Sequence, residues 1–321
     1  MTALLAALAL AALPQGSVRY RVTLAGEPVG VAALEIRCAA GACRAVYQVE
    51  LRGPAEAGGA LSSRRVEVEV DRAGRYRGGR LRAVADGAER ARSGPAGRVP
   101  SALAEVVLAA AARAGEACAD GFEEEGGRAI RACARPDGPV LRAEVDGTRE
   151  TIWPGRDGFP AEVLVEDRLR FVRDPAARVP ERAPRLSGSR VEGPVDARAA
   201  RSFCGVPRDP PAGALPRGLP PPRASGASCR EKTAAWLAAA ARAGALGRTA
   251  VGVAFDGLGF VWHAWAEVRT SSGWVPVDPS FGEAPARGPR FTLGRYAEGD
   301  GAGRAAAGRK VLACWGAARV E

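Results

Sequence analysis

The sequence predicts an α+β protein, with an antiparallel β-rich region first and a single long helix packed on a second antiparallel sheet later. Three observations predict this class. Short segments of alternating polar and apolar residues, separated by Gly and Asp-Gly turns, fill the chain from 17 to about 173. An alanine-rich helical pattern then spans 224–244. Three strand-like segments follow that helix closely, joined by short turns.

The first sixteen residues, MTALLAALALAALPQG, predict an export signal. An apolar core from Ala3 to Leu13 precedes a turn-like Pro-Gln-Gly, as in secretory signals, and it is too short to cross a bilayer as a helix. The usual basic residues before the core are missing, so a short buried helix is the alternative. No later segment has 18 consecutive apolar residues, so we expect an exported protein, periplasmic or extracellular, without a stable membrane span.

Seven cysteines are consistent with export, and their odd number leaves one thiol unpaired. Short separations suggest two local bridges, elimination gives a third, and Cys229 is left over, although seven cysteines allow many other pairings. The three bridges are Cys38–Cys43, Cys118–Cys133 and Cys204–Cys314. A zinc site is the alternative, but the chain has no C-x-x-C and a single histidine, so no metal is predicted.

The net charge of +10 invites an interpretation as a nucleic-acid or polyanion binder. Of the 46 basic residues only two are lysine, and asparagine is absent, which is typical of codon bias in a GC-rich genome. The arginines are scattered, without a basic run or interleaved aromatic residues. Nucleic acid is therefore not predicted as a partner, and an acidic partner stays a weak alternative.

The region 17–175 is predicted to be a β-rich N-terminal domain with one inserted helix. That helix covers Ser101 to Cys118, with Ser101 as its N-cap. No chemical motif occurs in this region, so we expect a scaffold or a substrate-presenting module.

The segment 176–223 contains ten prolines, including Pro220-Pro221-Pro222, and predicts a linker or an extended arm. A short helix is predicted within it, over 196–203. The boundary to a second domain, 224–321, is placed here.

The second domain begins with the helix ASGASCREKTAAWLAAAARAG. Ser225 or Ser228 is expected to cap it, and Gly244 to end it. Cys229 lies in its first turn, where the positive end of the helix dipole stabilises a thiolate. The strands RTAVGVAFDG, FVWHAWAEVRT and GWVPVDPS follow, and antiparallel pairing is expected.

The only imidazole that can activate this thiol is His263, although a lone histidine in an apolar run is more often a hydrogen-bonded core residue. A third group must orient the ring, and with no asparagine in the chain it must be a carboxylate or be missing. Glu267 lies roughly 13 Å along the same strand, too far to touch the ring. Asp278 ends the next strand and can lie opposite His263, whereas Asp256 is a weaker alternative.

Cys229 at a helix start, His263 in His-Ala-Trp-Ala-Glu-Val and Asp278 in Trp-Val-Pro-Val-Asp-Pro-Ser together resemble the transglutaminase-like superfamily. The resemblance covers about 224–281. It implies a papain-like core in which Cys229 attacks an amide carbonyl, His263 transfers the proton and Asp278 orients His263. Trp265 shares the face of His263 and is expected to form a wall of the substrate site. Trp262 and Trp274 are expected in the core.

One departure from papain-like enzymes is the missing oxyanion donor upstream of the cysteine, where many members have Trp or Gln. The backbone N–H of Cys229 supplies one donor, and the sequence names no second. We expect a hydrolase acting on protein or peptide amide bonds rather than a crosslinking enzyme, with no cofactor. A catalytically weak or inactive scaffold of the cell envelope is the alternative. The sequence does not predict the oligomeric state.

Overall fold

The computed structural model describes residues 12–55, 59–85, 88–90, 94–112, 115–124, 127–184, 190–194, 196, 199–210, 213–226, 228–315 and 320. Most of the proposed export signal, residues 1–11, lies outside them. The chain forms two compact units: Met1–Leu51 with Ser63–Pro180, and Arg52–Ser62 with Glu181–Glu321. The structure is mostly β, and its described residues include three α-helices.

The first unit carries a thirteen-stranded sheet in the order β6-β5-β4-β3-β2-β1-β13-β12-β11-β10-β9-β8-β7. The strands are β1 Gly16–Leu24, β2 Glu27–Ala39, β3 Ala42–Arg52, β4 Leu61–Asp71, β5 Tyr76–Ala85, β6 Ala88–Arg90, β7 Val99–Pro100, β8 Ala117–Phe122, β9 Ala129–Asp137, β10 Val140–Val145, β11 Thr148–Pro154, β12 Pro160–Val165 and β13 Leu169–Arg173. β1 pairs with both β2 and β13, which joins the two halves of the meander. The alternating sequence pattern explains strands such as β1, whose Val18, Tyr20, Val22 and Leu24 are buried on one face.

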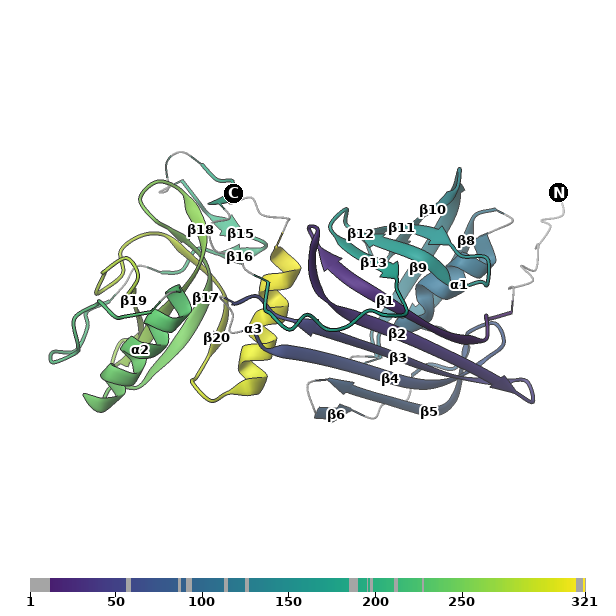
Figure 1. Ribbon diagram of the computed structural model, residues 1–321, viewed down its shortest axis with the longest axis horizontal. Coiled ribbons are helices and arrows are strands. Elements are labelled where there is room, and N and C mark those ends of the chain that lie inside the picture. The colour runs from purple at the N-terminus through teal and green to yellow at the C-terminus, as the bar shows by residue number, and fades with distance from the viewer. Residues whose placement is uncertain are drawn as a thin grey trace. The chain divides into compact units, whose positions relative to one another are not determined.

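The helix of this unit, α1 (Ala104–Ala111), packs inside the curled sheet (Figure 1). Its Leu108 lies in a buried cluster with apolar side chains of β8 to β12, among them Ile152. The predicted helix over 101–118 is therefore wrong in length. A 3-10 turn, η2 (Ser101–Leu103), precedes α1, and Cys118 belongs to strand β8.

Glu124 explains why Ser101 is not the expected N-cap. The carboxylate of Glu124 is completely buried and accepts hydrogen bonds from Arg64 Nη2 (2.7 Å), Ser101 Oγ (2.6 Å) and the Ala102 N–H (2.7 Å). The Ser101 hydroxyl thus serves a distant carboxylate, and no side chain caps η2.

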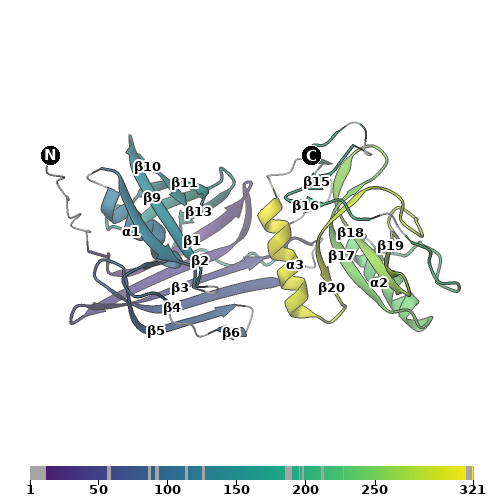
Figure 2. The same ribbon diagram turned by 180° about the vertical axis from the view of Figure 1, so that it is seen from behind.

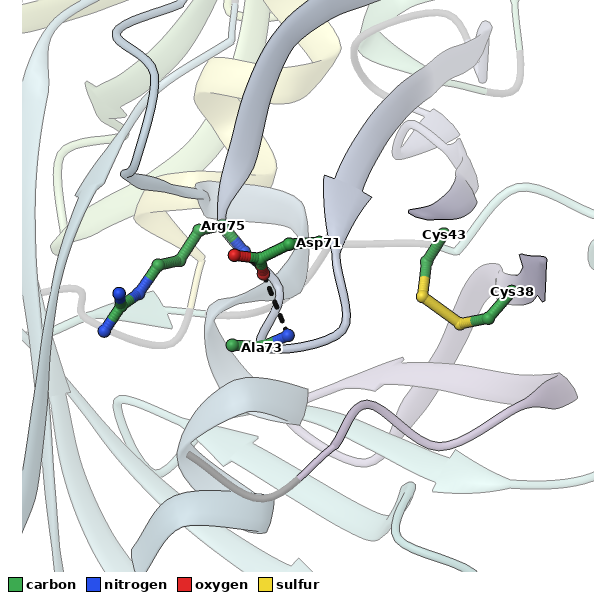
Figure 3. The surroundings of a disulfide bond; sticks show 5 residues. All are labelled: Cys38, Cys43, Asp71, Ala73 and Arg75. Atoms are coloured by element: carbon green, nitrogen blue, oxygen red, sulfur yellow. Dashed lines mark hydrogen bonds between the residues drawn. A yellow bond between two sulfur atoms is a disulfide. The ribbon is translucent and has the colours of Figure 1, made fainter. Parts of the chain in front are cut away.

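Two disulfides lie in this unit, Cys38–Cys43 and Cys118–Cys133. Each joins directly opposite residues of an antiparallel pair, with Cα atoms 4.0 Å apart. Figure 3 shows the first of them and, in its surroundings, the β4–β5 turn that Asp71 holds through a hydrogen bond from the Ala73 N–H (2.8 Å).

The second unit contains the sheet β14-β18-β17-β20, with β19 also paired to β18, and the hairpin β15–β16. Its strands are β14 Arg190–Val191, β15 Ser202–Phe203, β16 Val206–Pro207, β17 Gly247–Phe255, β18 Phe260–Thr270, β19 Gly273–Val277 and β20 Arg290–Tyr296. Helix α2 (Cys229–Arg242) packs on β17 and β18, and α3 (Gly301–Cys314) packs on β20 (Figures 1 and 2). The antiparallel pairing of β17, β18 and β19 is the one that the sequence predicts.

The proline-rich segment is packed within this second unit. The Trp236 indole on α2 donates to the carbonyl of Pro221 (3.0 Å), and the disulfide Cys204–Cys314 ties the segment to α3. The short helix expected over 196–203 is wrong, because strand β15 occupies Ser202–Phe203. The sequence reasoning also missed α3, whose N-cap is Asp300.

The three disulfides are the pairings proposed from the sequence, and they are typical of an oxidising, exported environment. In the described part of the chain, no helix has the length and apolar composition needed to cross a membrane.

Candidate active site

Cys229 is the first residue of α2, and the sequence around it explains this position. Ser228 is the N-cap, and it forms a capping box with Glu231. The Ser228 Oγ accepts from the Glu231 N–H (3.2 Å), and the Glu231 carboxylate accepts from the Ser228 N–H (3.1 Å). Cys229 is half-buried and is the one cysteine of the seven that forms no disulfide.

The N-terminal half of α2 meets strand β18 where β18 lacks a strand partner on one edge. β14 pairs with β18 only at Val261 and Phe260, and β19 pairs with it from Ala266 onward. Between these points Thr233 of α2 donates its hydroxyl hydrogen to the carbonyl of Ala264 (3.2 Å). This buried bond fixes the helix start beside the middle of β18.

His263 lies in this part of β18, paired with Gly252 of β17, and is 4% exposed. Its Nε2 lies 2.9 Å from Oδ2 of Asp278, which follows β19 and is completely buried. The other Asp278 oxygen, Oδ1, accepts from the N–H groups of Ser280 (3.0 Å) and Phe281 (3.1 Å). The structure therefore brings His263 and Asp278 together, as expected from the strand order.

The two other carboxylates considered for this role have different partners. Glu267 is bound by Arg248 (2.7 Å) and Arg295 (3.0 Å) farther along the sheet. Asp256 accepts from the N–H groups of Leu258 (2.8 Å) and Gly259 in the β17–β18 turn.

Opposing effects set the pKa of the imidazole. Burial disfavours the charged ring, but the hydrogen bonds to Asp278 and to the Cys229 thiol outweigh it, and the pKa of His263 rises to about 9. Burial also opposes ionisation of Asp278, but the bond to His263 and the neighbouring Arg290 cation lower the pKa of this carboxyl. Near neutral pH the site thus holds an imidazolium beside a carboxylate. Because Asp278 occupies Nε2, the Nδ1 atom is the ring nitrogen left for the thiol.

Aromatic rings enclose the imidazole. The half-buried Phe281 stacks on His263 with ring centres 4.3 Å apart and planes at 3°. Trp265 lies 6.3 Å away with its plane at 19° to the imidazole, and it is completely buried. The more exposed Phe281, which sequence reasoning missed, is therefore the ring that covers the imidazole.

Trp262 and Trp274, the two further tryptophans of these strands, differ in burial. Trp262 is buried, as expected, against Phe203 at a ring separation of 5.5 Å. Trp274 is only half-buried, so the expectation of a core residue is wrong, and the Arg248 guanidinium lies 3.8 Å above its ring. This surface contact is a cation–π interaction.

A second residue that the sequence did not reveal is Arg290 on β20. Its side chain is 2% exposed and donates from Nη2 to Asp278 Oδ2 (3.0 Å). The same guanidinium binds Glu283 (3.1 Å) and the carbonyl of Gly288 (2.7 Å). No local signal marks it, because it is one of 44 arginines in the chain.

The hydrogen-bond donors available to an oxyanion are limited. The Cys229 N–H stands at the first helical position, where no intrahelical carbonyl faces it. The Trp265 Nε1 has no hydrogen-bond partner among the described residues, but its side chain is too buried to reach a substrate. Among those residues, His, Cys, Asp and Glu also form no group of three suited to a metal.

Comparison with known proteins identifies part of this unit. Residues 209–279, which include Cys229, His263 and Asp278, match the family model of the transglutaminase-like superfamily. No curated protein matches the chain. One similar solved structure is a β-barrel-like protein of a domain of unknown function from Brucella abortus. It is 13% identical at a TM-score of 0.38, and the match covers 51% of this chain and 97% of that one.

Proposed function

Because residues 209–279 form a transglutaminase-like domain, we propose that the protein is a cysteine enzyme that cleaves protein or peptide amide bonds. One observation carries the proposal: the imidazole of His263 is bound at Nε2 by a buried carboxylate and interacts with the only unpaired thiol. The thiol fits the role of nucleophile, the imidazole that of acid–base catalyst, and the carboxylate that of the group that orients the imidazole.

In the acylation step, the Cys229 thiolate attacks the amide carbonyl carbon and forms a tetrahedral oxyanion. The Cys229 N–H at the start of α2 donates to that oxyanion. The His263 imidazolium then gives its Nδ1 proton to the amide nitrogen, the C–N bond breaks, and an amine leaves with a thioester on Cys229. Asp278 keeps the proton on Nε2 and holds the ring in place.

In the deacylation step, neutral His263 takes a proton from the acceptor, which attacks the thioester carbonyl, and the thiolate leaves. We propose water as this acceptor, because hydrolysis needs no binding site for a second substrate. An amine as acceptor would give transamidation by the same steps. Phe281, stacked on the imidazole, limits the access of other water to the His263–Asp278 bond.

The remaining features are assigned as follows. The arrangement of α2 beside β18, with Asp278 following β19, supports a papain-like core. The three disulfides and the apolar N-terminal segment support action outside the cytoplasm, in the periplasm or the extracellular space. We assign the β-rich unit to substrate presentation.

The first experiment measures alkylation of Cys229 by iodoacetamide between pH 5 and 9, read by peptide mass mapping. We expect labelling at pH 6, where an ordinary free thiol with a pKa of about 8.5 reacts very slowly. The rate should drop in His263→Ala and persist in Glu267→Gln, a matched change on the same strand whose carboxylate is bound to Arg248 and Arg295. Equal, slow labelling of all three proteins would remove the basis for an enzyme and favour a binding scaffold.

The second experiment identifies the acceptor. The protein is incubated with a mixed peptide substrate pool in ¹⁸O-labelled water, with and without a fluorescent primary amine. Hydrolysis places ¹⁸O in new carboxyl groups, whereas transamidation places the amine on peptides. Absence of both products, and of a Cys229 thioester in rapidly quenched samples, would contradict the proposed reaction.

A further inference from the structure

We propose that Arg290 is a positioning residue of this site, which restrains the Asp278 carboxylate and sets the proton affinity of His263 through it. The inference rests on the proposed function for its catalytic meaning. Its physical content, control of the His263 proton by Arg290, can be measured without any substrate.

The geometry places Arg290 and His263 on one oxygen atom. Arg290 Nη2 and His263 Nε2 lie 3.0 Å and 2.9 Å from Oδ2 of Asp278, so the two cationic groups are at most about 6 Å apart. Both side chains and the carboxylate are buried, at 2%, 4% and 0% exposure. Because the effective dielectric constant is lower in the protein interior, these charges interact more strongly than the same charges would on the surface.

The guanidinium is held on several sides, so its position is defined. Nη1 donates to the Gly288 carbonyl (2.7 Å), and Nη2 also reaches Glu283 (3.1 Å). The Trp265 ring lies 5.8 Å from the guanidinium carbon. The backbone of Arg290 is fixed as well, because its carbonyl accepts from the Asp209 N–H (2.8 Å).

The sheet has room for this contact because strand β17 carries small residues between β20 and β18. Ala254 is opposite Arg290 on one side and Val261 on the other, and Gly252 is opposite His263. Ala254 is completely buried. Because directly opposite residues of antiparallel strands share a face, a longer side chain at that position would crowd Arg290 and Val261.

Two consequences follow from a permanent cation at this oxygen. Arginine stays protonated at every working pH, so it favours the ionised form of Asp278. It also opposes a second positive charge on His263. The imidazolium must give its proton to the leaving amine in acylation, and the neutral ring takes one back from the acceptor in deacylation. An unopposed carboxylate would hold the imidazolium too firmly for the first of these transfers.

Glu283 moderates this effect with the opposite sign. Its carboxylate shares the Nη2 group with Asp278 and its side chain is 34% exposed. The charged groups that face His263 are therefore Asp278, the Cys229 thiol and, across Asp278, Arg290 with Glu283. Removing the Arg290 charge should therefore raise the titration midpoint of His263, and removing the Glu283 charge should lower it.

The test uses the single histidine of the chain, whose imidazole proton resonance titrates in NMR spectra without ambiguity of assignment. In Arg290→Gln we expect the His263 midpoint to rise by about one pH unit, because an opposing cation is removed. In Glu283→Gln we expect a smaller decrease. Arg295→Gln is the matched control on the same strand, since Arg295 binds Glu267 and Asp209 but not Asp278. Its midpoint should stay at the wild-type value.

Two further variants separate the effect of charge from that of folding. Arg290→Lys retains the charge without the fork that binds two carboxylates and should keep the His263 midpoint near the wild-type value. Arg290→Gln/Glu283→Gln removes the ion pair as a neutral unit and should raise the midpoint less than Arg290→Gln alone. An unchanged midpoint in every variant that lacks the Arg290 charge and retains the wild-type near-ultraviolet circular dichroism would overturn the proposal. So would an equal shift in Arg295→Gln.

The pH profile of kcat/KM then separates the two proposals. If the alkaline limb moves to higher pH in Arg290→Gln, Arg290 acts on the working site, because His263 gains proton affinity. A purely structural role would lower the rate and leave this limb in place. A shifted NMR midpoint in a protein without turnover would contradict the proposed function and leave the control of His263 by Arg290 intact.

Discussion

Glu124 in the first unit and Asp278 in the second are both completely buried carboxylates with an arginine partner and backbone N–H donors. They differ in one partner. Glu124 binds the Ser101 hydroxyl, which does not titrate, whereas Asp278 binds an imidazole that interacts with a thiol. Burial and pairing with arginine are therefore common to both carboxylates. The titratable partner is what sets Asp278, the proposed orienting group, apart from Glu124.

The largest effect is expected when the proposed nucleophile, Cys229, is removed. Cys229→Ser should lower kcat by about 10⁶-fold, the scale found when a triad nucleophile is lost, and should leave the free energy of unfolding nearly unchanged. The measurement is single-turnover kinetics beside urea unfolding. Retained amide cleavage in the variant would show that the second unit uses another nucleophile.

Asp278→Asn tests the orienting carboxylate itself. We expect kcat to fall by about 10⁴-fold, because the amide neither stabilises the imidazolium by charge nor holds the neutral imidazole in the productive tautomer. The pKa of His263 should also fall, since the bond to Asp278 is one of the interactions that raise it. NMR titration of the single histidine measures this change. An unchanged titration would mean that Asp278 is as structural as Glu124.

Glu124→Ala is the corresponding change in the first unit. It removes the buried carboxylate that accepts hydrogen bonds from Arg64, Ser101 and the Ala102 N–H, so we expect a loss of about 3 kcal/mol in the free energy of unfolding. The iodoacetamide reactivity of Cys229, measured on the folded variant, should match the wild type. A changed reactivity would show that Glu124 influences the site.

The pH dependence of kcat/KM tests the proposed role of His263. The pKa of about 9 means that kcat/KM should fall above about pH 9, where the imidazolium that protonates the leaving amine is lost.

The raised pKa of His263 also contributes to the free energy of unfolding, and the sign of this contribution can be worked out. Because the folded pKa lies above the unfolded value of 6.5, the contribution is complete below pH 6.5 and is lost as pH rises through 9. Comparing urea unfolding of wild type and His263→Ala at pH 6 and 10 checks this.

The smallest effect is expected at Glu150, a third buried carboxylate. Its Oε2 has no hydrogen-bond partner among the described residues, and burial raises its pKa to about 9. This acid therefore costs stability as pH rises above 4.5, the opposite of Asp278, whose lowered pKa costs stability only as pH falls below 3.8. Glu150→Gln should raise the melting temperature by a few degrees at pH 8 and little at pH 4, measured by calorimetry. A lower melting temperature at pH 8 would indicate an undetected partner.

Features that depend on near neighbours in the chain could be predicted from the amino-acid sequence. The capping box of Ser228 and Glu231 defines the start of α2 and hence the position of Cys229. Alternation and turn residues define β18 and β19, and a short connection between antiparallel strands limits how far Asp278 can be from His263. The disulfide partners in the first unit are also close in sequence, so their pairing could be proposed from spacing.

The distant side chains that complete the site could not be predicted, because packing of the whole unit brings them together. Arg290 reaches Asp278 across β17, and its sequence neighbourhood does not distinguish it from the many surface arginines. Phe281 stacks on His263 because Asp278 binds its backbone N–H, a contact within a loop that no periodic pattern predicts. Ser101 likewise does not form the helix cap that the local sequence predicts, because its hydroxyl binds Glu124, which lies in another strand–loop segment. Local propensity sets where helices and strands begin and end, whereas the choice among equivalent polar partners depends on which of them the packed fold buries together.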